Sequence, residues 1–346
     1  MLTGSAPGSA RPGAPPPPAR SPGPLSAVAR GGRALAGSLI TPSAVALRRW
    51  ALAGVLASVA IIATGAAVRL SQSGLGCPDW PACTAHSIGA AGATGQTLVH
   101  RWIEFGNRLV TAAILVVAVG VSVAAWRFRT ARTGQPRRDL LLLALAQPAG
   151  IVAEAVLGGI VVLTKLDPVW VSVHFLLSMA LTGLAVMLYV RAAALTQDAP
   201  PAAPPAPVRR DLRVLSVVLA AVTAAMVAAG TVVTGTGPLA GAGGVARYHL
   251  PLAGVTQLHA DIGWLLTGLT VALVTGLRLT GAPPRAIRPG WLLIGLILAQ
   301  GSVGYAQYFA GLPAGLVWVH VTGAVLIWVT ALRLTFALHE RSPAAV

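Results

Sequence analysis

Four of the seven histidines lie in or beside long apolar stretches, where ionisable side chains are costly and usually have a function. They are His100, His174, His259 and His320. Each falls within the first turn or two of an expected membrane-crossing helix, and all four of these helices begin on the same side of the membrane. We therefore expect the four imidazoles at similar depth, one pair in each half of the chain.

Neutral imidazole is a common metal ligand, and two histidines from facing helices can hold a heme between them. Zinc is the competing metal, but it usually recruits Cys, Asp or Glu at short spacing from His, and that pattern is absent. A hydrogen bond between helices explains one such histidine equally well, whereas four at matched depth favour heme. The remaining His86, His249 and His339 fall in expected loops and in the C-terminal tail.

Glu104 lies one helical turn after His100 and one turn before Arg108, so the three side chains share one helix face. A carboxylate beside an intramembrane metal site can accept a proton or act as an electrostatic partner. The alternative is that Glu104 only forms an ion pair with Arg108.

Cys77 and Cys83 are the only cysteines, and both lie in the segment SQSGLGCPDWPAC. We expect this segment outside the cytoplasm, where a disulfide can persist. A loop closed in this way would cap the site or exchange electrons through thiol chemistry. Two unrelated free thiols are the alternative.

The elements that position these residues are membrane-spanning helices. Of the 346 residues, 55% are hydrophobic and only 10% are charged, so the sequence predicts an all-α integral membrane protein in a lipid bilayer. Apolar runs of about 20 residues are long enough to cross the hydrocarbon core. Eight are expected, near Trp50 to Leu70, Trp102 to Ala125, Leu140 to Leu163, Trp170 to Val190, Val214 to Thr234, Gln257 to Leu277, Gly290 to Phe309 and Gly315 to Phe336.

The arginines predict the orientation, because basic residues in short loops stay in the cytoplasm. One side collects most of them, and we expect both termini there, with the protein in the cell (plasma) membrane. The net charge of +16 is explained by this topology, so we expect no nucleic-acid partner. The residues on that side are Arg48, Arg49, Arg127, Arg129, Arg132, Arg137, Arg138, Arg191, Arg209, Arg210, Arg213, Arg278, Arg285 and Arg288.

The sequence predicts two tandem, pseudo-symmetric four-helix bundles. Aligning His174 with His320 also aligns Gly158 with Gly304 and Glu154 with Gln300, and a weaker match places His100 opposite His259. The predicted domains are a disordered cytoplasmic tail (1–45), an N-terminal unit (46–191), a Pro/Ala-rich linker (192–213), a C-terminal unit (214–338) and a second tail (339–346).

Four segments together resemble the heme A synthase family: GAAVRLSQSGLGCPDWPAC, IEFGNRL, LGGIVVLTKLDPVWVSVHF and VGYAQYFAGLPAGLVWVH. The resemblance covers nearly all of Trp50 to Phe336. It implies oxidation of the C8 methyl group of heme O to a formyl group, giving heme A for aa3-type cytochrome oxidases. It also implies partners in heme O synthase and cytochrome oxidase assembly, and an electron acceptor that the sequence does not identify.

The resemblance also implies the site residues. The substrate heme would occupy the N-terminal unit, with His174 as a ligand, and a heme b cofactor would occupy the C-terminal unit between His259 and His320. Glu104 matches the family's carboxylate, and Cys77 and Cys83 match its cysteine pair.

One position departs from the family's pattern, since Asn107 stands where a histidine is usual. Either His100 replaces that ligand from two turns earlier, or the substrate heme has only His174. The repeat alignment of His100 with His259 favours His100, although it lies about 10 Å further along the helix. Asn107 and Arg108 are then expected to line the substrate pocket.

Two other classes of protein fit parts of the pattern. A diheme b-type cytochrome that exchanges electrons with quinone would carry the same histidine pairs, but it would need neither Glu104 nor the cysteine loop. A transporter built from parallel repeats would be expected to contain broken helices and polar midplane residues, for which Glu154 is the one deep candidate.

Overall fold

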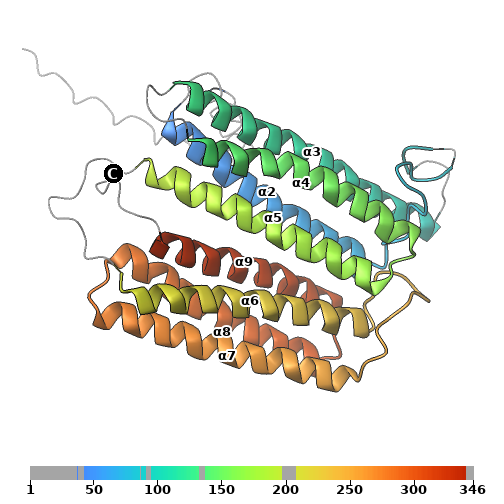
Figure 1. Cartoon of the computed structure of the whole chain (residues 1–346). Helices are drawn as coiled ribbons and strands as arrows, with labels where there is room; N and C mark the ends of the chain where they lie inside the picture. The colour runs from blue at the N-terminus through green and yellow to red at the C-terminus, as the bar shows by residue number, and fades with distance from the viewer. Residues whose placement is uncertain are drawn as a thin grey trace, which may run out of the picture.

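The computed structural model describes Gly37 and residues 43–85, 87–90, 95–131, 137–196 and 208–339. Within these ranges the chain is helical, and its only β pairing is the isolated bridge between Thr84 and Ser87. The helices, labelled as in Figure 1, are α2 (Ala44–Leu70), α3 (Gly95–Ala131), α4 (Arg138–Leu163), α5 (Pro168–Ala194), α6 (Arg210–Thr236), α7 (Leu252–Leu279), α8 (Pro284–Phe309) and α9 (Ala314–His339).

Each of these eight helices is long and apolar enough to cross a membrane, which confirms the predicted fold class and the eight spans. Most helices begin several residues before the predicted apolar run, and in two of them a polar side chain caps the start. In α2, for example, the Ser43 side chain accepts a hydrogen bond of 3.0 Å from the backbone N–H of Ala46.

The helices form two groups that lie side by side (Figure 1). In the N-terminal group α2 and α4 each pack on α3 and α5. In the C-terminal group α6 and α8 each pack on α7 and α9. Contacts of α9 with α2 and α5, and of α5 with α6, join the groups. The indole N–H groups of Trp318 and Trp328 donate across this junction to the carbonyls of Ala63 and Met179, both at 2.8 Å.

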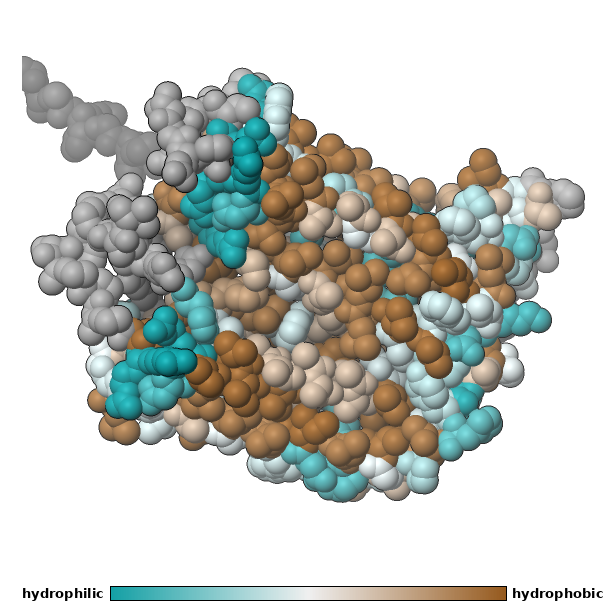
Figure 2. All heavy atoms as spheres, viewed as in Figure 1, coloured by the Kyte–Doolittle hydropathy of each residue, from teal (hydrophilic) through white to brown (hydrophobic). Residues whose placement is uncertain are grey.

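The two ends of the molecule differ in packing. At the end with Ser43 and His339, here called the tail end, buried Leu, Val and Ala side chains fill both groups, as around Leu47 and Leu140 in one and Leu273 and Leu334 in the other. The opposite end, with residues 71–85, 87–90 and 237–251, is the loop end (Figure 1). Apolar side chains cover the middle of the visible face, and polar ones gather at the ends (Figure 2).

Matching turns at the loop end join α4 to α5 and α8 to α9. Leu166 and Leu312 adopt positive φ values of 60° and 62°. Their backbone N–H groups donate to the carbonyls of Val161 and Gln307, both at 2.8 Å. The same turn therefore precedes His174 and His320, and sets both residues at the same point of their helices.

Several sequence predictions are not tested by this fold. The pseudo-symmetry, the domain division and the cytoplasmic placement of the termini stay predictions. Most of the predicted N-terminal tail, the centre of the linker, the last seven residues, His86 and Arg132 lie outside the described residues.

Candidate functional site

A cavity of about 1420 Å³ runs through both helix groups and is lined by residues from all eight helices. This volume exceeds the roughly 300–1000 Å³ of a pocket for a drug-sized ligand. Its walls are mainly apolar. Six of the predicted site residues line it: Glu104, Asn107, Arg108, His174, His259 and His320.

In the C-terminal group, His259 on α7 and His320 on α9 form a pair. Their ring centroids lie 6.2 Å apart, with the ring planes at 67°. A glycine on the neighbouring helix faces each ring: a Cβ atom on Gly230 would lie 3.2 Å from Cε1 of His259, and one on Gly304 would lie 3.1 Å from Cε1 of His320. Both approaches are tight, so the absence of a side chain at these glycines makes room for the imidazoles.

In the N-terminal group, His174 on α5 contacts a carboxylate. Its Nδ1 meets Oε2 of Glu154 on α4, and the other carboxylate oxygen accepts a hydrogen bond of 2.9 Å from Ser178. Glu154 is 8% exposed. A Cβ on Gly158 would lie at an ordinary 3.6 Å from Cε1 of His174. The sequence aligned Glu154 with Gln300 but gave no sign that the carboxylate touches the histidine.

Asn107 on α3 lines the cavity. Its Oδ1 lies 2.7 Å from the hydroxyl of Thr64 on α2. This places an amide, and no imidazole, on the α3 side of the N-terminal group's cavity.

His100 is not among the residues that line the cavity. Its Nδ1 lies 2.8 Å from the Ser73 hydroxyl in the loop after α2. The same loop crosses α3 so closely that a Cβ on Gly76 would overlap the His100 carbonyl. His100 therefore lies outside the cavity that His174 lines, two helical turns before Asn107 on α3.

Glu104 and Arg108 hold the cysteine loop. Glu104 Oε1 accepts from Arg108 at 2.7 Å, and Oε2 accepts from the backbone N–H of Cys77 at 2.8 Å. The ion pair proposed as the alternative role is thus present, but it is only part of the arrangement. The Arg108 guanidinium also donates to four loop carbonyls, those of Cys77, Asp79, Pro81 and Ala82, at 3.1 to 3.3 Å.

Cys77 and Cys83 form a disulfide, as one of the two alternatives predicted. Between them, Trp80 packs on Gly159 of α4, where a Cβ would lie only 2.6 Å from the indole. Trp80 and Pro81 both line the cavity. The loop therefore covers part of the cavity at the loop end.

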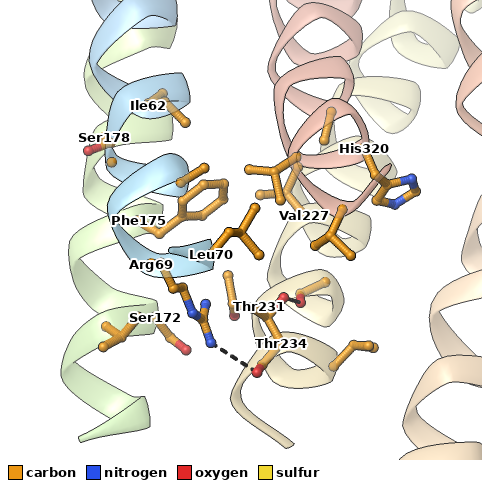
Figure 3. Close-up of a pocket in the computed structure, with 18 of the residues that line it drawn as sticks. Ile62, Arg69, Leu70, Ser172, Phe175, Ser178, Val227, Thr231, Thr234 and His320 are labelled. Carbon is orange, nitrogen blue, oxygen red and sulfur yellow. Dashed lines mark hydrogen bonds between the residues drawn. The ribbon is translucent and has the colours of Figure 1, made fainter. Parts of the chain in front are cut away.

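The sequence also gave little sign of the role of Arg69, one of the few basic residues at the loop end. Its guanidinium donates to the carbonyls of Thr234 at 2.9 Å and Leu239 at 3.0 Å, which ties α2 to the end of α6 (Figure 3). Figure 3 also shows Phe175 and Ile62 between the two groups, with the His320 imidazole pointing away from them.

These features define a class: a multi-pass membrane protein with histidines around a large intramembrane cavity. Among the described residues, no group of three or more His, Cys, Asp or Glu side chains is arranged to hold a metal ion, so the imidazoles stand in a pair or singly. The chain belongs to the COX15-CtaA family, described as cytochrome oxidase assembly protein, whose model matches residues 48–332.

Curated relatives agree with this family and with the resemblance seen in the sequence. The chain is 23% identical over 330 residues to the heme A synthase of Shewanella oneidensis, covering 82% of this chain and 93% of the relative. It is 24% identical over 334 residues to that of Rhizorhabdus wittichii, covering 83% and 92%. A shorter match of 28% over 137 residues to that of Lysinibacillus sphaericus covers 39% and 42%.

Proposed function

We propose that this protein is an enzyme that makes heme A by oxidising the C8 methyl group of heme O to a formyl group. Membership of the family and the names of the relatives support an enzyme acting on heme. The observation that carries the proposal for this chain is the His259–His320 pair in a cavity large enough for a macrocycle.

The pair fits a heme iron in its dimensions. Two metal–imidazole bonds of about 2 Å each, plus the short step from each nitrogen to its ring centre, put the ring centroids about 6 Å apart. The observed separation is 6.2 Å. Nδ1 of both rings is buried, so Nε2 is the nitrogen that would reach the iron. In this proposal His259 and His320 hold heme b, and the substrate heme O lies in the N-terminal group with His174.

The residues of this chain would bind and orient the heme and seal the cavity from water. Bound heme supplies a redox-active iron, and the apolar walls hold the macrocycle away from water. Conversion of a methyl to a formyl group with water as the oxygen source (CH3 + H2O → CHO + 4 H+ + 4 e−) releases electrons and protons, so an electron acceptor is needed as a further partner. Glu104 lies 6% exposed at the cavity and carries the carboxylate that we assign to catalysis, as an electrostatic partner for positive charge that develops beside it.

The setting we propose is the cell membrane, with both termini in the cytoplasm and the disulfide loop outside. Heme O synthase would supply the substrate, and aa3-type cytochrome oxidase would receive the product. The positions of the arginines support this orientation, since Arg137, Arg138, Arg209 and Arg210 all lie at the tail end.

The test is to express the protein with an enzyme that produces heme O, purify it in detergent, and identify the extracted hemes by chromatography and mass. We expect heme A, or a hydroxylated heme O, together with heme b. Heme b alone would replace this proposal with an electron-transferring diheme cytochrome. Absence of any heme would overturn the whole assignment.

A further inference from the structure

The two helix groups can be compared at the same points because their turns match. Leu166 and Leu312 have the same backbone conformation, and His174 and His320 each follow by the same number of residues. Gly158 and Gly304 face these two rings. Residues at equivalent places should therefore meet a heme in equivalent ways, so the places where the groups differ are informative.

The first difference is at the ligand opposite His174. The sequence ATGAAV at 63–68 in α2 corresponds to AAGTVV at 228–233 in α6. In the C-terminal group, Gly230 of this segment faces His259. In the N-terminal group, Asn107 lies against Thr64, one residue before Gly65, which is the match of Gly230. Asn107 thus meets α2 within one residue of the place where His259 meets α6.

An asparagine amide is a poor iron ligand but a good hydrogen-bond donor and acceptor. His100 does not substitute for it, because its ring lies against Ser73 outside the cavity. The α3 side of the N-terminal group therefore offers polar atoms from Asn107 and Thr64 but no imidazole.

The second difference is the residue that contacts His174 on its Nδ1 side. Glu154 places a carboxylate on Nδ1 of His174, and Ser178 holds the carboxylate in position. At the equivalent place in the other group, the Gln300 amide donates to the backbone carbonyl of His320. A carboxylate bound to the far nitrogen of a ligating imidazole fixes the ring and increases its electron donation.

We propose that the N-terminal group binds its heme through His174 alone and leaves the opposite iron face open to a small diatomic ligand beside Asn107 and Thr64. Glu154 is a positioning residue that acts through His174. The His259–His320 pair closes both faces in the C-terminal group. This inference rests on the proposed binding of heme by both groups.

The experiment measures CO binding in the purified holoprotein. Hemin is added first if the N-terminal group does not contain a full equivalent of heme. Carbon monoxide is added to the reduced protein, and the spin state of the oxidised protein is read by electron paramagnetic resonance. We expect one high-spin heme that binds CO and one low-spin heme that does not. His174→Ala should remove the high-spin signal alone, which assigns that signal to the N-terminal group.

Asn107→His is the decisive variant, and Asn107→Gln is its matched control. The histidine should convert the high-spin heme to low spin and abolish the CO difference spectrum, whereas glutamine should leave both signals in place. Two low-spin hemes and no CO binding in the unaltered protein would overturn the inference. If the unaltered protein did not bind CO but the His100→Ala variant did, His100 would be the ligand on the second iron face.

Glu154→Gln tests the positioning role by copying the other group's residue. We expect CO binding to persist while the Fe–His stretching band shifts to lower frequency, with recovery in Glu154→Asp. An unshifted band would show that Glu154 does not act through His174.

Heme analysis of the same sample separates this inference from the proposed function. Heme A without CO binding leaves the function standing and rejects the open site. CO binding without heme A supports the open site and rejects the proposed function.

Discussion

At the residue scale, two buried carboxylates of similar burial differ in what they contact. Glu104 is 6% exposed and Glu154 is 8% exposed. Glu104 meets Arg108 and the backbone of the cysteine loop, so its charge is paired within the protein. Glu154 meets a histidine that we assign as a heme ligand. The two carboxylates therefore have different partners although they are buried to a similar extent.

Glu104→Gln should retain heme while heme A output falls about 100-fold, in line with the loss of one catalytic acid–base or charged group. The amide keeps the size of the side chain and can still accept from Cys77. Heme A per mole of protein, measured in extracts, checks this. Unchanged output at full heme content would remove Glu104 from the mechanism.

The glycines that face the histidines provide a second prediction. In Gly304→Ala the new Cβ would lie 3.1 Å from His320, and overpacking of this kind costs about 1–3 kcal/mol. We expect heme b retention to weaken about tenfold, equivalent to about 1.4 kcal/mol. Gly295→Ala on the same helix is the control, because no atom outside the neighbouring backbone of α8 lies within 4 Å of its Cβ. Equal heme retention in the two variants would contradict the assigned packing.

The sequence predicted most of these residues but not all of their contacts. The histidines and Glu104 were found because ionisable groups stand out in apolar runs. The position of His100 was not found, because it depends on a loop residue, Ser73, that approaches from 27 residues away in the chain. The contact of Glu154 with His174 was missed for a similar reason: it joins two helices, and a repeat alignment does not state which side chains touch.

At the element scale, the cysteine loop is closed on itself by the disulfide and is held to α3 by the hydrogen bonds of Arg108 and Glu104. The eight helices were predictable because each apolar run is long enough to span a bilayer, whereas the path of this loop depends on backbone contacts that have no sequence pattern.

Replacing both Cys77 and Cys83 by serine should lower the free energy of unfolding of the loop by about 2–3 kcal/mol, from the chain entropy of a short closed loop. Because Arg108 still holds four carbonyls, we expect the helices and the hemes to be retained. Thermal unfolding in detergent, with reductant-treated unaltered protein as control, measures the first effect. A variant that keeps both hemes but makes no heme A would instead assign the thiols to electron transfer.

At the scale of the whole molecule, the arginines predict that the tail end faces the cytoplasm. Ala246→Cys in the loop after α6 and Thr280→Cys in the turn after α7 place one exposed thiol at each end. A membrane-impermeant maleimide added to intact cells should label the first variant only, and permeabilised cells should show labelling of both. The reverse pattern would invert the topology.

The contrast between the packed tail end and the hollow loop end has a consequence for how the protein matures. The tail-end core is packed by its own side chains and can fold as soon as the helices are inserted, whereas the loop-end halves of the same helices surround the cavity. Amide hydrogen exchange should therefore be slow around Leu273 and Leu334 with or without heme, and slow around Gly230 and Gly304 only after loading. The protein without heme would then be folded and stable at its tail end, and its loop end would become ordered when heme binds.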